Sequence, residues 1–414
     1  MERATPEERE RLNALFAELC AIASPSGQEA ACSARVRAEL EGLGLAVEED
    51  AAGNLLARVP ARRAEGGGAG GGGGAGEAAR TILLCAHLDT VPHGDTPIEP
   101  VLVDEGWENA HDAILGADNK AAVAVMLAAA RRAVERGGAD VGLELLFTTG
   151  EETALLGAKE FDASQLTADF GYVFDHATPI GEIVVASPTY FKLVAEFHGQ
   201  AAHAGIRPED GRNAITAAAR AIASITSGRI DDETTTNVAG IEGGRSHTNI
   251  VPDHARFWAE ARSLDPRKAE AEIQKMVGAI HEAANHTGGG SAGGEGASGG
   301  GDGAGNGGAS AGGGIGCDVD VDVDVEKLFV GFRTAPDAPE LLAAERALRA
   351  AGYEPRHITT GGGSDANALR VQGFPCICLA NGTERNHEPT ERVSVAALEG
   401  MLDVTFALME EAAT

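Results

Sequence analysis

The sequence predicts an α/β domain with a partly parallel sheet, interrupted by an inserted ferredoxin-like α+β domain. The chain has 414 residues, more than one hydrophobic core usually serves, so two domains are expected. Up to residue 188, apolar strands alternate with helices, which is typical of an α/β layer. The order then becomes strand, helix, strand, strand, helix, strand, which is the ferredoxin-like pattern. We expect residues 1–188 and 333–414 to form the first domain, and 189–332 the insert.

The elements of the first domain follow from the spacing of its apolar residues. Apolar side chains from Leu12 to Ile22 recur at helical spacing. The cluster Ser24–Gly27 ends this helix, and another begins near Gln28. Short apolar runs further along the chain predict strands, and longer runs predict helices. The expected strands are 55–59, 81–86, 143–148, 171–174 and 375–379, and the expected helices are 120–134, 154–161, 339–351 and one from Ser394.

The insert contains four expected strands, at 191–198, 234–241, 255–262 and 318–325, and two expected helices, at 213–225 and 266–284. The tracts 66–76 and 288–316 are dominated by glycine. Such a composition buries no core, so we expect flexible loops. No Lys-Ser or Lys-Thr follows the first tract, which excludes a phosphate-binding loop. Aspartates 318, 320, 322 and 324 alternate with valine, which favours a solvated strand face over a calcium site.

Charge and cysteine content narrow the class of protein. The formal net charge is −30, a field that repels nucleic acids and anionic membranes. No apolar run reaches the roughly 20 residues that span a bilayer, and we expect no secretory signal at the charged N-terminus. The six cysteines show no zinc-finger or Cys-x-x-Cys spacing. Buried thiols and a reducing, cytoplasmic location are therefore expected.

Several chemically active residues follow apolar strands. His87 and Asp89 end one strand, and this spacing suits a metal ligand with a carboxylate that orients its ring. Asp175 ends another strand, and Glu151 and Glu152 follow a third. Sites in α/β sheets gather at the carboxyl ends of strands, so these side chains are expected to meet. A core histidine beside a turn aspartate is the alternative for the first pair.

Taken singly, the remaining candidate site residues also allow structural interpretations. Asp118 opens an apolar helix, where it could cap the helix or bridge two metals with its two oxygens. Glu151 and Glu152 could be a surface pair, but adjacent carboxylates after a buried strand favour a cation, with Glu152 as ligand and Glu151 as general base. His387 lies near the C-terminus. Imidazole and carboxylate ligands without thiolates suit zinc, with cobalt or manganese as alternatives.

The motifs together resemble the dizinc exopeptidase superfamily, which contains peptidase T, carboxypeptidase G, succinyl-diaminopimelate desuccinylase and aminoacylase. The resemblance is strongest to bacterial peptidase T-like proteins and covers nearly the whole chain apart from the glycine tracts. It rests on the strings AHLDTV, GADNKAAVA, TTGEE, VFDH, GQAAHAG, GRNAI, GRIDDETTTN, GGRSHTNIVPD, EARSL, GGGSDAN and NHEPTE. The implied fold is a zinc-exopeptidase catalytic domain, with a mixed sheet flanked by helices, carrying the ferredoxin-like insert as a lid.

The resemblance also implies a role for each metal-site residue. His87 and Asp175 would bind one divalent metal, and Glu152 and His387 the other. Asp118 would bridge the two ions, which are expected to be zinc. Asp89 would orient the first histidine, and Glu151 would be the general base.

Residues of the lid and of one loop would contact the substrate. His203, in the A-H-x-G segment, would stabilise the oxyanion, and the family allows it to be supplied across a homodimer formed through the lid. Asn249 and Arg262 would hold a substrate carboxylate or oxyanion. Gly362, Gly363 and Ser364 would line the pocket.

Three functions compete at this point. The first is a metallopeptidase that cleaves small peptides, of the tripeptide aminopeptidase type. The second is an N-acyl amino acid deacylase or a carboxypeptidase with the same metal centre. The third is a non-enzymatic metal-binding protein, which the complete ligand set and Glu151 disfavour.

Overall fold

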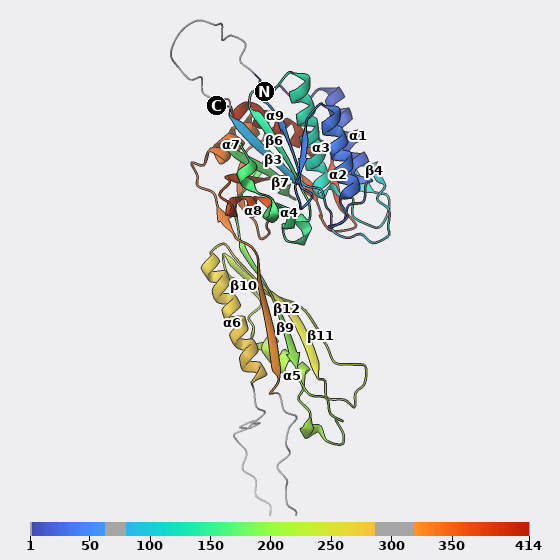
Figure 1. Ribbon diagram of the computed structural model, residues 1–414, viewed down its shortest axis with the longest axis vertical. Coiled ribbons are helices and arrows are strands. Elements are labelled where there is room, and N and C mark those ends of the chain that lie inside the picture. The colour runs from blue at the N-terminus through green and yellow to red at the C-terminus, as the bar shows by residue number, and fades with distance from the viewer. Residues whose placement is uncertain (1, 63–79, 286–317, 414) are drawn as a thin grey trace, which may run out of the picture. The chain divides into compact units, whose positions relative to one another are not determined.

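The computed structural model describes residues 2–62, 80–285 and 318–413, so the two glycine tracts, 66–76 and 288–316, lie outside the described residues. The chain divides into two compact units (Figure 1). Unit 1 comprises Met1–Pro188 and Phe329–Thr414, and unit 2 comprises Thr189–Leu328. The insert is predicted to span 189–332, and the structure divides the chain after Leu328. Phe332 and Arg333 pair with the sheet of unit 1.

Unit 1 is built on a mixed sheet with the strand order β1-β2-β6-β3-β7-β16-β8-β14, and β15 pairs with β8. The central strand β3 runs parallel to both of its neighbours, β6 and β7. Their carboxyl ends therefore lie at one edge of the sheet. The strands are β1 (Val47–Glu49), β2 (Leu55–Val59), β3 (Thr81–His87), β6 (Gly142–Thr148), β7 (Phe170–His176), β8 (Glu182–Ser187), β14 (Phe332–Arg333), β15 (Arg356–Thr359) and β16 (Cys376–Ala380).

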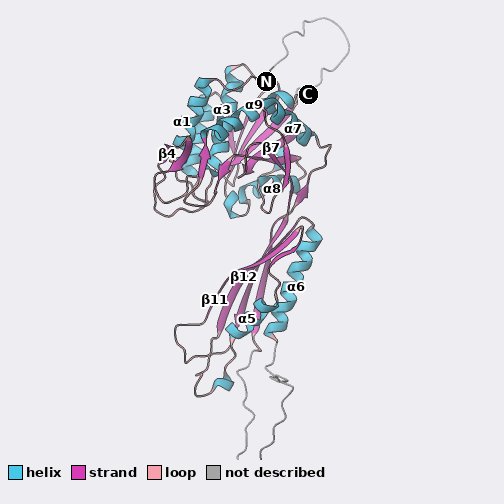
Figure 2. Ribbon diagram, turned by 180° about the vertical axis from the view of Figure 1, so that it is seen from behind, coloured by secondary structure: helices cyan, strands magenta, loops and turns pink. Residues whose placement is uncertain are grey.

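Helices cover both faces of this sheet (Figure 2). One face carries α1 (Pro6–Cys20), α2 (Ala30–Gly42), α3 (Ala117–Glu135), α7 (Pro339–Ala351) and α9 (Val395–Glu411). The other face carries α4 (Leu156–Glu160) and α8 (Asp365–Val371). This layered arrangement explains why the central strands are apolar throughout, since a strand covered on both faces has no solvated side.

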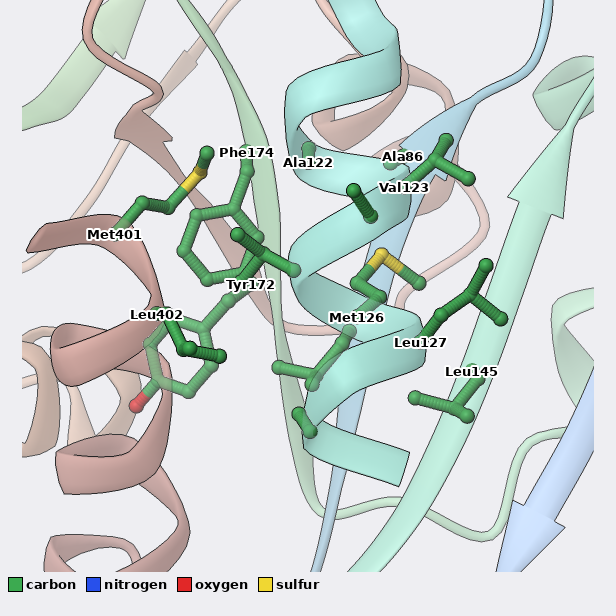
Figure 3. Packing of buried hydrophobic residues seen from close by; sticks show 14 of the residues in the cluster. Ala86, Ala122, Val123, Met126, Leu127, Leu145, Tyr172, Phe174, Met401 and Leu402 are labelled. Atoms are coloured by element: carbon green, nitrogen blue, oxygen red, sulfur yellow. The ribbon is translucent and has the colours of Figure 1, made fainter. Parts of the chain in front are cut away.

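The main core fixes α3 against the sheet (Figure 3). Met126 and Leu127 of this helix are buried against Leu145 of β6 and Tyr172 of β7. Apolar residues of α9, including Met401, close the cluster from the other side. The first turn of α3, which carries Asp118, is thereby held beside the carboxyl ends of the strands.

The predicted helix 154–161 was too long. The structure has a 3₁₀ turn, η1 (Glu151–Thr153), followed by the short α4. Ala154 and Leu155 between them have φ angles of 66° and 63°, a left-handed conformation that interrupts a helix. A small sheet in the order β17-β18-β5-β4 was not predicted, because its strands are short and partly polar. Its strands are β4 (Pro100–Val103), β5 (Gly106–Asn109), β17 (Thr383–Glu384) and β18 (Arg392–Ser394).

Unit 2 is a five-stranded sheet in the order β10-β11-β12-β9-β13, with α5 and α6 packed on one face. Its core contains Leu193, Phe197 and Phe257 from the strands and Ile273 and Ile280 from α6. The elements are β9 (Thr189–His198), α5 (Ala214–Ser224), β10 (Gly228–Asp231), β11 (Thr234–Gly243), β12 (His254–Ser263), α6 (Pro266–Ala284) and β13 (Asp320–Phe329). The four aspartates that alternate with valine are exposed, as predicted.

The state of the cysteines and the presence of membrane-spanning helices can be examined for the described residues. Cysteines 20, 32, 85, 376 and 378 are buried and free, and Cys317 lies outside the described residues. Within the described ranges, no helix combines the length and apolar content that crossing a bilayer requires.

Candidate metal centre

Five predicted metal ligands come together at the carboxyl edge of the central strands of unit 1. Their donor atoms form two groups that share Asp118: one with His87 and Asp175, the other with Glu152 and His387. Within each group all donor atoms lie within 4.8 Å of one another. This is the grouping that the family resemblance implies for two metals.

The two oxygens of Asp118 point to different histidines. Its Oδ1 lies 3.3 Å from Nε2 of His87, which is also 3.5 Å from Oδ1 of Asp175. Its Oδ2 lies 3.5 Å from Nε2 of His387, which is 2.9 Å from Oε1 of Glu152. A carboxylate with one oxygen on each side is arranged to bridge two cations.

The donor set fits divalent cations. Nε2 of His87 and Oδ1 of Asp118 are buried and have no hydrogen-bond partner, an arrangement that costs free energy unless a ligand occupies the space between them. Among the described residues, the site carboxylates form no ion pair with lysine or arginine. Imidazole and carboxylate donors of this kind suit zinc and similar divalent ions.

The pKa values express the same crowding of acidic groups. Burial raises the pKa of Asp175 to about 7, although His87 opposes the shift. Burial alone would lower the pKa of His87, but the carboxylates of Asp118, Asp175 and Asp89 raise it well above its ordinary value. Both shifts favour the protonated form of the side chain. In the absence of metals, these protons balance the negative charge of the carboxylates, which bound cations would otherwise balance.

Asp118 does not cap α3. The cap position is Gly116, no side chain caps the helix, and the backbone of Asp118 is not helical. Its Oδ2 instead accepts a hydrogen bond from Nδ2 of Asn386 at 2.7 Å. The side chain is therefore turned toward the histidines rather than toward the helix.

Glu391 holds the loop that carries Asp118. Its carboxylate accepts hydrogen bonds from the backbone N–H groups of Leu115, Gly116 and Asp118, each at 2.8 Å. The side chain is 2% exposed. These three amides precede the regular part of α3 and would otherwise have no acceptor.

Asp89 connects the first histidine to the turn that carries the two glutamates. Nδ1 of His87 lies 3.0 Å from the carbonyl oxygen of Asp89 and 3.4 Å from its Oδ1, so Nδ1 is the donor and Nε2 is the nitrogen that faces the other site residues. The same carboxylate accepts the backbone N–H groups of Glu151 at 2.9 Å and Glu152 at 3.1 Å. It thus orients more than the imidazole.

Glu151 lies beside both ligand groups, and its carboxylate forms a third cluster with His87 and Glu152. Burial raises its pKa well above the ordinary value, and the charge of Asp175 adds to the shift. Asp365, at the start of α8, is a further buried acid near this cluster and accepts the hydroxyl hydrogen of Thr148. Burial raises the pKa of Asp365 to about 6.

Sequence reasoning missed Asn386, Glu391 and Asp365. Each lies in a short string that carried the family resemblance, NHEPTE or GGGSDAN. Asn386 donates to the ligand Asp118, Asp365 accepts the hydroxyl of Thr148, and Glu391 accepts backbone N–H groups. Because none of the three is itself one of the predicted ligands, no ligand spacing marked them.

The three predicted pocket residues of the GGGSDAN loop have structural contacts. The carbonyl of Gly362 accepts the hydroxyl of Ser187 at 2.8 Å. A Cβ on Gly363 would lie 2.6 Å from the ring of Phe329, so a larger residue would have to displace this ring. Ser364 is the N-cap of α8 and is buried. Their role toward substrate stays a prediction.

His203, Asn249 and Arg262 lie in unit 2. The first two are on neighbouring segments, since the N–H of Ala204 donates to the carbonyl of Asn249 at 2.9 Å. Arg262 lies on β12, where it stacks on Tyr190 and pairs with Glu260 at 3.1 Å. Their part in the site stays a prediction.

Comparison with known proteins finds two matching family models. Residues 189–288 match the M20 peptidase dimerisation domain, and residues 72–184 match peptidase family M28. The second range includes the candidate residues from His87 to Asp175. Over 411 residues the chain is 34% identical to the uncharacterised protein YqjE of Bacillus subtilis (strain 168), covering 97% of this chain and 98% of that protein.

Two solved structures are similar over almost the whole chain. Aminopeptidase PepT of Bacillus cereus ATCC 10987 is 34% identical, with a TM-score of 0.79, covering 98% of this chain and 99% of that one. A tripeptidase of Staphylococcus aureus subsp. aureus Mu50 is 28% identical, with a TM-score of 0.82, covering 98% of both chains. The fold class predicted from the sequence is therefore confirmed.

Proposed function

The chain belongs to the M20 peptidases, in their peptidase T-like group, and on this premise we propose that it is a two-metal aminopeptidase acting on small peptides, tripeptides in particular. The observation that carries the proposal is the pair of ligand groups that share Asp118, with Glu151 beside them. The aminopeptidase and the tripeptidase among its relatives support the substrate class.

His87 and Asp175 would hold one cation, Glu152 and His387 the other, with Asp118 shared. We propose zinc as the native ion, because the donors are imidazoles and carboxylates without thiolates. When bound, two such ions lower the pKa of water and balance charge that develops on the scissile carbonyl.

Glu151 would be the general base. Its carboxylate is within the cluster formed with His87 and Glu152, but the ligand groups around Asp118 are complete without it. We propose that it takes a proton from the attacking water and delivers it to the leaving amine.

His203 is suited to stabilise the oxyanion as a hydrogen-bond donor. The backbone N–H of Gly205 donates to its Nδ1 at 3.2 Å, so a neutral ring carries its proton on Nε2. The side chain is exposed in unit 2. One such donor typically contributes about 3–4 kcal/mol to transition-state stabilisation. Asn249 and Arg262 would hold the carboxylate of the substrate, and Gly362, Gly363 and Ser364 would line its pocket.

We further propose that the protein acts as a homodimer formed through unit 2, which contains the match to a dimerisation domain. A reducing, cytoplasmic location is consistent with five free, buried cysteines.

A substrate panel tests the proposal. The full chain, loaded with zinc, cobalt or manganese in separate assays, is given tripeptides, dipeptides, N-acetylated tripeptides and N-acyl amino acids. We expect release of the N-terminal residue from tripeptides with a free amino group, and little turnover after acetylation. Turnover of N-acyl amino acids alone would replace the peptidase by a deacylase.

A further inference from the structure

The segment Ser24–Glu29, between α1 and α2, has contacts that the proposed function does not explain. From the sequence it indicates only a break between two helices. In the structure, Ser24 is fully buried and Glu29 is 8% exposed. Both side chains lie next to the turn and strand end that carry the metal-site residues, as their hydrogen bonds show.

Glu29 and Asp89 together accept the three successive backbone N–H groups of Gly150–Glu152, a segment that is called the catalytic turn below. Gly150 donates to Oε1 of Glu29 at 3.1 Å. Glu151 and Glu152 donate to the two oxygens of Asp89. The turn that carries both the proposed base and a proposed ligand is therefore held by two carboxylates, of which Glu29 comes from the N-terminal segment.

Ser26 supports the second of these carboxylates. Its hydroxyl donates to Oδ2 of Asp89 at 2.7 Å, the same oxygen that accepts the N–H of Glu152. The backbone of the segment is fixed as well, since the N–H of Gly27 donates to Oε1 of Glu29 at 2.9 Å. Glu29 thus contacts the catalytic turn directly, through the N–H of Gly150. Ser26 acts on the same turn indirectly, through the carboxylate of Asp89.

The segment is itself anchored to the interior. The hydroxyl of Ser24 donates to the carbonyl of Leu88 at 2.7 Å and accepts a hydrogen bond from Nζ of Lys120 at 2.6 Å. Lys120 is 1% exposed and lies two residues after Asp118. A backbone bridge between Pro25 and Thr90 completes the attachment. These contacts attach the segment to the backbone around Leu88, the residue between His87 and Asp89.

We propose that Glu29 and Ser26 are positioning residues for the metal centre. Through the N–H of Gly150 and the carboxylate of Asp89 they set the place of Glu151 and Glu152 relative to His87. The inference rests on the proposed function for its catalytic consequence, but the effect on metal binding is independent of the substrate.

The test compares Glu29→Ala and Ser26→Ala with Glu29→Gln and Ser26→Thr, which keep an acceptor or a hydroxyl. Glu41→Ala is the matched control, because Glu41 is an exposed glutamate at the end of α2. For each full-length variant, kcat and KM are measured on a tripeptide. Cobalt is titrated into the metal-free protein while its visible absorption is followed, and the Tm is recorded.

We expect the two alanine variants to bind cobalt about 10–100-fold more weakly than the wild type, with an altered visible spectrum. We expect kcat to fall about 100-fold, because a displacement of about 1 Å at the base has that effect, while KM changes much less than kcat. The glutamine and threonine variants should recover most of the loss. Glu41→Ala should match the wild type.

Unchanged cobalt binding, spectrum and kcat in both alanine variants would overturn the inference, and a lowered Tm alone would mean that the segment only stabilises the fold. If the wild type binds cobalt but cleaves no peptide, the proposed function fails. The inference then stands or falls on the cobalt titrations.

Discussion

Replacing Glu391 tests how the loop of Asp118 is held. The carboxylate is the acceptor for three buried N–H groups, those of Leu115, Gly116 and Asp118. Glu391→Ala leaves all three without an acceptor. Glu391→Gln is sharper, because an amide has one oxygen and one NH₂ group. Its oxygen can serve the two amides that now share Oε2, and the NH₂ group then faces the N–H of Asp118, so donor meets donor.

The expected loss of unfolding free energy follows from the number of hydrogen bonds that each variant of Glu391 loses. An unsatisfied buried donor costs about 1–3 kcal/mol, so three would cost about 3–9 kcal/mol. We expect the lower part of this range, about 3–5 kcal/mol, for alanine, because the smaller side chain leaves space in which water can accept some of these N–H groups. Glutamine loses one bond of three and should cost about 1–3 kcal/mol. Metal affinity should fall about 10–100-fold in both variants, as for other supports of metal ligands.

Urea unfolding of the metal-free protein measures the first effect, and metal titration measures the second. Glu388→Gln is the control, since Glu388 is an exposed glutamate three residues earlier in the same segment. If Glu391→Gln keeps the wild-type unfolding free energy and metal affinity, the bonds to this loop do not position Asp118 and the reasoning is wrong.

The remaining predictions concern the base, an ion pair, the second glycine tract and the metals. Glu151→Ala should keep both metals and lose about 10²–10⁴-fold in kcat; a near-normal rate would remove it as the base. Burial opposes ionisation of Glu8, but Arg132 and the Thr5 amide lower its pKa from 4.5 to about 2. The stability that this ion pair contributes should therefore be complete above pH 4.5 and fade as pH falls toward 2. The difference in unfolding free energy between wild type and Glu8→Gln should shrink over that window, and a constant difference would contradict it. Replacing the glycine tract 288–316 by a short turn should leave metal binding and kcat unchanged, because a backbone hydrogen bond already joins the end of α6 to the residue before β13; loss of either would make the tract structural. Chelation should lower the Tm by about 5 °C or more, since ligand at 100 times its Kd stabilises by about 2.7 kcal/mol; equal melting with and without metal would argue against two tightly held ions.

The sequence predicted the central part of the fold because its physical signals are local. The strands β3, β6 and β7 are apolar runs covered on both faces, and the residues after them are polar where the sheet meets its functional edge. The order of these strands in the sheet has no such local signal. It was the structure that brought the carboxyl ends of three neighbouring parallel strands together.

The supports of the site could not be predicted in the same way. Glu29 and Glu391 are single glutamates in irregular segments, and their partners are backbone amides. A backbone amide is present at nearly every residue, so it leaves no pattern in the sequence. The short helix after Glu152 was mispredicted for a related reason, since the left-handed residues at 154 and 155 are not glycines.

The carboxylates of Glu29, Asp89 and Glu391 are needed for one common physical reason. Asp118 and the Glu151–Glu152 turn lie where strand gives way to helix, and their N–H groups lack the partners of regular structure. Carboxylates fill this need, and they bring more negative charge to a site that already contains acidic ligands. Buried acids in such number are costly without cations, as the raised pKa values of Asp175 and Asp365 indicate. The same hydrogen bonds that shape the site thus make its stability depend on the metals, so the geometry of the backbone and the occupancy of the centre are coupled.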